Sequence, residues 1–146
     1  MSETLRIAVR AFGPFETALA RQFADFVDAT GADAVLEAVP MDLNPLHEAV
    51  IGRRGLATGE WDVAFLATDW LAEAQGAGLL EDLEPHLAHA PIADFPDAWS
   101  PSLTGLQRFA GGFWGMPYHD GPECLVYRRD LLDAAGLEVP RTWDAF

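Results

Sequence analysis

The chain of 146 residues is long enough for one ordinary domain, and because 50% of it is hydrophobic we expect a folded core rather than disorder. Its 9 basic residues, all arginine, face 23 acidic ones and give a formal net charge of -14. This balance argues against a nucleic-acid partner, because phosphate backbones are bound by clustered Lys and Arg. The single cysteine, Cys124, cannot form an internal disulfide, and we expect a buried thiol there.

The first predicted elements are a strand, a helix and a second strand. Residues 5–9 alternate apolar and polar side chains, which is typical of a strand. From residue 15 to residue 27 the apolar side chains recur every three to four positions, which predicts a helix, and Gly31 is expected to end it. Residues 34–39 predict a second strand that Pro40 should stop.

The same alternation continues with a helix from residue 43 to residue 50, a strand and another helix. Residues 63–67 form a continuous apolar run, which is typical of a parallel strand buried on both faces, and residues 69–77 predict the helix that follows. Alternating strands and helices predict an α/β fold with a mostly parallel sheet flanked by helices. Ligands of such sheets bind beyond the carboxyl ends of the strands, where Phe12 and Asp69 lie.

The second half of the chain is richer in proline and predicts shorter elements. Gly111 and Gly112, between two apolar runs, indicate a tight hairpin turn. Residues 124–127 predict a strand and residues 130–135 a short helix. Thr142 is expected to cap the start of a further helix.

Three stretches of the chain carry a family resemblance by their order and spacing. The first is WDVAFLATDW at residues 61–70, followed by GLLEDL. The second is GMPYHD at residues 115–120, followed by LVYRRDLL, and the third is AGLEVPRTWD at residues 135–144. Together they resemble the maltose-binding-like proteins of extracellular solute-binding protein family 1, which deliver sugars to ABC transporters.

The resemblance implies a type II periplasmic-binding-protein-like fold, in which two α/β lobes joined by a hinge hold a ligand between them. Residues 1–117 would form the first lobe, and residues 118–146 the crossing segment and the start of the second lobe. Because family members are much longer, we expect this chain to be part of a larger protein that is a monomer when complete. Family members act outside the cytoplasm, although no signal peptide opens this sequence.

By the same resemblance, the chain would be the substrate-binding component of an ATP-driven importer. It would bind a sugar or related polyol by hinge closure and then dock on a membrane permease. No cofactor, metal or catalytic residue is expected, because binding and release make and break no bond.

The predicted ligand residues suit a sugar, whose apolar faces stack on aromatic rings and whose hydroxyls pair with carboxylates. We expect Asp69 to accept sugar hydroxyls and Trp70 to stack on a ring, and the family has a matching acidic residue at Asp69. The alternative is structural: Asp69 or Thr68 caps the third helix, and Trp70 packs in the core.

Further ligand contacts are predicted on either side of this pair. The family lines its cleft with the crossing segment, which implies ligand roles for Tyr118, His119 and Asp120; the alternative is a partly exposed loop with a packed tyrosine. Phe12 follows the first strand and is expected either to contact ligand or to cover the sheet as a core aromatic.

The remaining large aromatic residues are expected to be structural. Trp143 should pack its helix against the lobe, and Trp61 should cover part of the core. The same structural role is expected for Trp99, Trp114 and Tyr127.

Two other functions stay open at this point. A glycosidase would use Asp69 and Asp120 as a carboxylate pair, whose separation the sequence does not supply. A cytoplasmic ligand-sensing or interaction protein of the same fold would explain the missing export signal. A metal site at His86 and His89 is not expected, because their context predicts an exposed turn.

Overall fold

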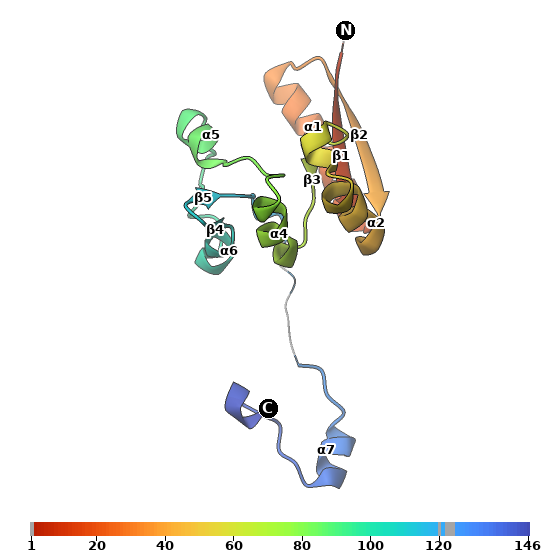
Figure 1. Cartoon of the computed structure of the whole chain (residues 1–146), viewed down its shortest axis with the longest axis vertical. Coiled ribbons are helices and arrows are strands. Elements are labelled where there is room, and N and C mark those ends of the chain that lie inside the picture. The colour runs from red at the N-terminus through yellow and green to blue at the C-terminus, as the bar shows by residue number, and fades with distance from the viewer. Residues whose placement is uncertain (1, 120, 122–124) are drawn as a thin grey trace.

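A three-stranded parallel sheet forms the centre of the lobe in the computed structural model, which describes residues 2–119, 121 and 125–146. Strand β1 (Glu3–Arg10) lies between β2 (Ala34–Met41) and β3 (Val63–Ala64) (Figure 1). The β1–β2 ladder runs in register from Glu3 opposite Ala34 to Arg10 opposite Met41. The central position of β1 buries Ile7, Ala8 and Val9, and the predicted parallel sheet is confirmed.

Helix α1 (Gly13–Thr30) connects β1 to β2, as the apolar spacing predicted. Pro14 at its first turn fits the fixed backbone angle of a helix start. Gly31 ends the helix in the left-handed conformation with φ 68°, and its N–H donates to the Val27 carbonyl. This conformation favours glycine, so the predicted end of the helix is confirmed.

The connection from β2 to β3 combines three short helical turns. Helix α2 (Leu43–His47) passes directly into a π-helical turn, η1 (Glu48–Gly52), and α3 (Gly55–Thr58) follows. These turns place Leu46, Ala49 and Val50 in the core with at most 1% exposure.

Two expectations about the strands are wrong. Strand β2 continues through Pro40 to Met41, which is tolerated because β2 lies at an edge of the described sheet and need not donate from every residue. Strand β3 contains only two residues, and Val63 is 43% exposed rather than buried on both faces. A continuous apolar run cannot distinguish a central strand from the edge strand that β3 forms here.

A second layer follows β3, beginning with the 3-10 turn η2 (Thr68–Trp70) and helix α4 (Leu71–Gly76). The elements after α4 are α5 (Glu84–His89), α6 (Pro101–Leu106), β4 (Arg108–Phe109) and β5 (Gly112–Phe113). Strands β4 and β5 pair antiparallel around Ala110 and Gly111, with φ values of 48° and 82°. The predicted hairpin is confirmed, with its turn one residue earlier than expected.

The hairpin is fixed to the rest of the lobe through Phe113, which is fully buried and lies 5.6 Å from the Phe95 ring. One oxygen of the Asp82 carboxylate accepts from the backbone N–H groups of Phe113 and Glu84, each at 3.0 Å. Leu83 N–H donates to the Phe113 carbonyl at 2.8 Å. Hydrogen bonds to the backbone and apolar packing around Phe113 therefore attach the β4–β5 hairpin to residues 82–95.

Residues 125–146 lie apart from the lobe (Figure 1). They contain α7 (Arg129–Ala135) and the 3-10 turn η3 (Trp143–Ala145). The predicted cap is confirmed, because the Thr142 hydroxyl accepts from Ala145 N–H at 3.2 Å.

Two predictions for this segment are wrong. Residues 125–127 form no strand, and Val126 is 87% exposed, because no neighbouring strand pairs with them in the described part of the chain. Trp143 is 90% exposed instead of packing its helix against the lobe. The prediction for Cys124 falls outside the described residues.

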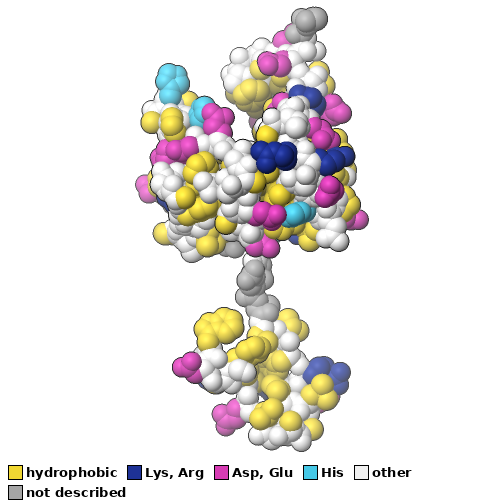
Figure 2. Space-filling view, in the orientation of Figure 1, with side chains coloured by type: hydrophobic (Ala, Val, Ile, Leu, Met, Phe, Trp, Pro, Cys, Tyr) yellow, Lys and Arg dark blue, Asp and Glu magenta, His cyan; other side chains and the backbone are white. Residues whose placement is uncertain are grey.

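Acidic side chains are spread over the visible faces of both the lobe and the C-terminal segment (Figure 2). A search of the helices in the described ranges found none long and apolar enough to cross a membrane.

Candidate functional site

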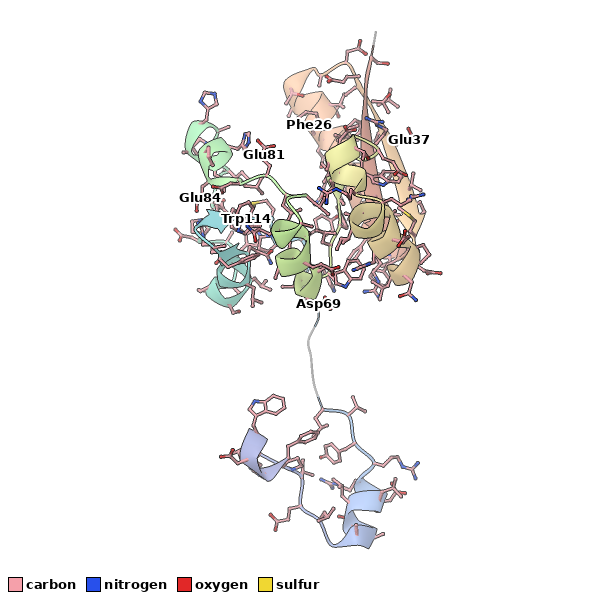
Figure 3. All side chains as sticks on the ribbon, viewed as in Figure 1. Phe26, Glu37, Asp69, Glu81, Glu84 and Trp114 are labelled. Atoms are coloured by element: carbon pink, nitrogen blue, oxygen red, sulfur yellow. The ribbon has the colours of Figure 1, made fainter. Side chains whose placement is uncertain are left out.

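The candidate site lies at the carboxyl edge of the sheet, where β1, β2 and β3 all end because the strands are parallel. Asp69 lies toward this edge and Phe26 toward the opposite end of the lobe (Figure 3). The chain leaves the three strands through segments 10–12, 42–44 and 65–69, so these segments lie side by side.

An aromatic cluster gathers at this edge, and we call it the edge aromatic group. Its members are Phe12, Phe15, Phe65, Tyr118 and His119. The Phe15 ring is central: its centroid lies 5.0 Å from Phe12, 5.7 Å from Tyr118 and 5.1 Å from His119. Phe65 and Tyr118 are 4.4 Å apart. Three predicted ligand residues, Phe12, Tyr118 and His119, are thus brought together from distant parts of the sequence.

The edge aromatic group is also accessible. Phe12 is 47% exposed and Tyr118 is 40% exposed. Edge contacts with Phe15 hold these rings while leaving part of each ring open to solvent. The cluster therefore provides a fixed, partly exposed apolar surface.

Sequence reasoning did not assign Phe15 or Phe65 to the site, because it placed Phe15 on the core face of the helix and Phe65 in a buried strand. Two signals could have found them. Phe15 follows Phe12 by three residues at a helix start, so the two rings share one face. Phe65 comes directly after the last residue of β3, at the sheet edge that binds ligands in α/β folds.

A polar hollow of about 490 Å³ lies at the ends of β1 and β2. Its lining consists of Arg10, Ala11, Asp42, Leu43, Asn44 and Pro45. Ala11 directly precedes Phe12 in the chain, so the hollow and the edge aromatic group both lie at the carboxyl edge of the sheet. Arg10 supplies hydrogen-bond donors, Asp42 acceptors, and Asn44 both. The sequence interpretation missed these three residues.

Trp70 forms a second group at the carboxyl edge. Its indole is half-buried and packs against the core cluster that contains Leu46 and Val50. Its ring meets the His47 ring edge to face at 4.9 Å and 87°, and His47 Nε2 lies 3.0 Å from Glu73 Oε2. The packing that we weighed as an alternative for Trp70 is present, and its ligand role stays a prediction.

Asp69 is exposed, and neither neighbouring helical turn uses it as a cap. The residue before η2 is Ala67, the residue before α4 is Trp70, and neither helix start has a side-chain capping hydrogen bond. The structural alternative for Asp69 and Thr68 is therefore not observed, and the role of Asp69 in ligand binding stays a prediction. Asp120 lies outside the described residues.

One ion pair of the lobe joins Arg6 in β1 to Asp62, which directly precedes β3. The Arg6 backbone N–H and then its guanidinium donate to the Asp62 carboxylate, and these hydrogen bonds lower the pKa of Asp62 below its ordinary value. Within the described part of the chain, Arg10 at the hollow takes part in no ion pair.

His86 and His89, the two histidines considered for a metal, belong to no metal-ligand group among the described residues. His86 Nε2 is 2.7 Å from Glu81 Oε1 in an exposed pair. Over residues 2–119, 121 and 125–146, no three His, Cys, Asp or Glu side chains are grouped to hold a metal ion.

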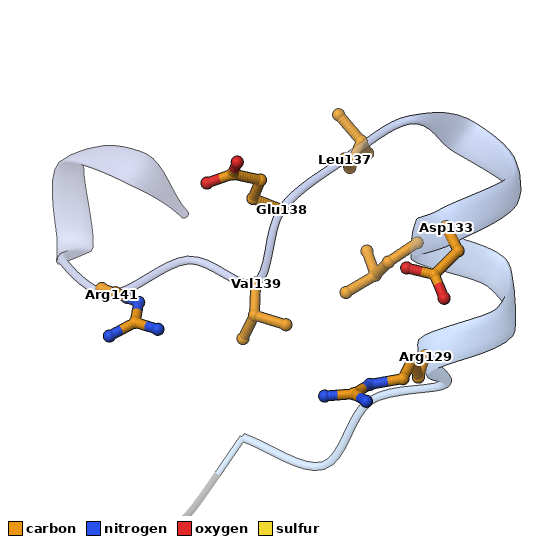
Figure 4. Close-up of a pocket in the computed structure, with 7 residues that line it drawn as sticks. Arg129, Asp133, Leu137, Glu138, Val139 and Arg141 are labelled. Atoms are coloured by element: carbon orange, nitrogen blue, oxygen red, sulfur yellow. The ribbon is translucent and has the colours of Figure 1, made fainter.

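A second hollow, of about 410 Å³, lies within the C-terminal segment (Figure 4). It is lined by Arg129, Leu132, Asp133, Leu137, Glu138, Val139 and Arg141. None of the predicted ligand residues lines it, so it supports no part of the candidate site.

Comparison with known proteins agrees with this fold. The structure resembles the crystal structure of an ABC transporter solute-binding protein from Agrobacterium radiobacter K84 in complex with ribitol, with a TM-score of 0.65 and 25% identity. The alignment covers 97% of this chain and 35% of that chain. An uncharacterized lipoprotein from the oleD 5′ region of Streptomyces antibioticus is 27% identical over 139 residues, which is 94% of this chain and 29% of the relative.

The chain thus spans about a third of the length of these relatives. The sequence profile of the bacterial extracellular solute-binding proteins matches residues 44–146, which is more than half of the chain. Both the matched profile and the structural neighbour are those of solute-binding proteins, and the neighbour's fold agrees with the α/β lobe that the family resemblance implied. The chain belongs to the bacterial extracellular solute-binding protein family.

Proposed function

We propose that this chain belongs to the substrate-binding component of an ATP-driven importer and that it binds a neutral sugar or polyol. The observation that carries this proposal is that the edge aromatic group and the polar hollow both lie at the carboxyl edge of a parallel sheet. The family supports binding, and the ribitol complex of the structural neighbour supports a polyhydroxylated ligand.

The chemistry of the two surfaces suits such a ligand. The exposed parts of Phe12 and Tyr118 would stack on C–H faces, and each aromatic contact contributes about 0.5–1.5 kcal/mol beyond burial. Arg10, Asp42 and Asn44 would bond hydroxyl groups, at about 1.5–3 kcal/mol for each hydrogen bond to a charged group. Arg10 and Asp42 carry opposite charges, so the hollow favours a neutral ligand over a strongly charged one.

The proposed mechanism is hinge closure. Residues 1–117 would form one lobe, with residues 118–146 as the crossing segment and the start of the second lobe. A ligand that contacts both lobes would shift the equilibrium from the open to the closed form, and the closed form would dock on a membrane permease. The protein would act as a monomer outside the cytoplasm, a location that the lipoprotein relative supports.

The test is a comparison of matched aromatic substitutions in the native protein, by calorimetric titration with ribitol and a panel of neutral sugars and polyols. Phe12→Ala and Tyr118→Ala should each weaken binding by about tenfold, or roughly 1.4 kcal/mol. Phe26→Ala is the control, because Phe26 is 49% exposed, close to the 47% of Phe12, but lies toward the opposite end of the lobe. Wild-type affinity in both edge variants would remove the aromatic group from the binding site.

A further inference from the structure

Three side chains connect α2 to the chain after β3. His47, the last residue of α2, meets the Trp70 indole edge to face at 4.9 Å and 87°. On its other side, His47 Nε2 is hydrogen-bonded to Glu73 Oε2 at 3.0 Å. The side chains of His47 and Glu73 are 35% and 54% exposed, so the contact lies at the protein surface.

The Trp70 indole packs against the core cluster and also contacts the His47 ring. Trp70 ends the three-residue turn η2 and directly precedes α4, and neither helix start has a side-chain capping hydrogen bond. The orientation of the indole is set by the side chains that contact it, which are the core cluster and His47. An edge-to-face aromatic contact favours one relative orientation of the rings, and the Glu73 hydrogen bond fixes the orientation of the His47 ring.

Helix α2 also joins this contact to the polar hollow. Its first residues, Leu43, Asn44 and Pro45, line the hollow, and its last residue is His47. A ligand in the hollow would thus touch the same five-residue helix that holds Trp70.

We propose that His47, held by Glu73, is a positioning residue that fixes the Trp70 indole for ligand binding at the carboxyl edge. The inference rests on the proposed function, because it takes Trp70 as a ligand contact. His47 acts through Trp70 and does not itself touch the ligand.

The experiment is a double-mutant cycle in the native protein, with the neutral sugar or polyol of the panel that binds the wild type most tightly. Trp70→Ala should weaken binding by at least about tenfold and His47→Ala by about threefold to tenfold. Adding His47→Ala to Trp70→Ala should weaken binding no further, because a positioning residue has nothing left to position. Glu73→Ala, which leaves both rings in place, should weaken binding by about twofold to threefold.

The chain offers a matched control and a spectroscopic readout. His86 forms the same kind of pair with Glu81, at 2.7 Å, and has no role in the proposal, so His86→Ala should leave the affinity unchanged. In the ligand-free protein, His47→Ala should change the near-ultraviolet circular dichroism of the indoles, and His86→Ala should not. If His47→Ala fails to fold, His47→Phe keeps an aromatic ring, loses the Glu73 bond, and should bind about as Glu73→Ala does.

The outcomes separate the inference from the proposed function. If Trp70→Ala weakens binding and His47→Ala does not, the positioning role is wrong and sugar binding stands. Additive losses, an unchanged indole spectrum, or wild-type affinity in Trp70→Ala would also overturn the positioning role alone. If the wild type binds no member of the panel, the proposed function fails, and the inference fails with it.

Discussion

The lobe and the C-terminal segment differ in burial but not in local helix signals. In the lobe, Ala8, Val9, Val50 and Phe113 are fully buried. In residues 125–146 most large apolar side chains are exposed, and none is fully buried; the exposed ones are Leu125, Val126, Tyr127, Leu131, Leu137, Trp143 and Phe146. Helices α1 and α7 nevertheless both end at a left-handed glycine.

The comparison separates the local signals that set the ends of a helix from the apolar burial that stabilises it. A left-handed glycine sets where the main helix of each region ends, Gly31 for α1 and Gly136 for α7. Burial of apolar surface, the main source of folding free energy, is concentrated in the lobe. Equivalent substitutions in the two regions should therefore have unequal effects on stability.

The largest difference is expected for a leucine in each region. Leu46→Ala removes a side chain that is 1% exposed in α2, and it should lower the free energy of unfolding by about 2–5 kcal/mol. Leu131→Ala makes the same chemical change in α7, where the residue is 60% exposed, and should change it by at most about 0.5 kcal/mol. Denaturant unfolding of both variants measures this, and equal losses would contradict the contrast.

A smaller effect is expected at the glycines that end the two helices. Gly31 and Gly136 have φ values of 68° and 64°, and an added Cβ would meet nothing within 4 Å at either. Substitution by alanine should therefore destabilise the fold only through backbone strain, by about 1–2 kcal/mol. Gly31→Ala should lower the free energy of unfolding of the lobe by that amount. Gly136→Ala should increase amide exchange in α7 and leave the lobe unchanged. A loss of lobe stability in Gly136→Ala would show that the two regions unfold together.

The smallest effect concerns acid stability. Hydrogen bonds from the Arg6 backbone and guanidinium lower the pKa of Asp62 in the folded state, and a side-chain hydrogen bond from Arg128 lowers that of Asp130. A lowered pKa adds stability that is present above the unfolded pKa and is lost as the pH falls through the folded pKa. In Asp62→Asn, the free energy of unfolding of the lobe should therefore fall slightly less than in the wild type as the pH drops below about 4.

Asp130→Asn is the matched control, because Asp130 lies in the C-terminal segment and should not affect the unfolding of the lobe. Unfolding curves recorded from pH 6 downward for both variants test this pair. A flattened profile in Asp130→Asn alone would reverse the expected contrast.

The elements that sequence patterns predicted well depend on local signals. The end of α1 at Gly31 and the Thr142 cap, both predicted, are set by a few neighbouring residues. The short β3 and the unpaired residues 125–127 were predicted wrongly, because strand pairing depends on distant partners that a local pattern does not contain. The π-helical turn at Glu48–Gly52 had no recognised signal.

In the candidate site, too, some contacts could be predicted from the sequence and others could not. Strand order predicted that residues after β1 and β3 meet, and Phe12 and Phe65 are linked through Phe15. The contact between His47 and Trp70 was not predicted, because it joins the segments after β2 and β3 through side-chain packing. The ligand roles of these residues remain predictions.

The most direct test of the central claim is hydrogen–deuterium exchange of the native protein with and without the neutral sugar or polyol that binds it. We predict that ligand slows exchange at the carboxyl edge, in residues 10–12, 42–47, 65–70 and 118–119. Exchange in α5 and α6 should change little. Protection confined to α5 and α6, or no ligand-dependent protection in the lobe, would contradict the proposal that this edge binds the ligand.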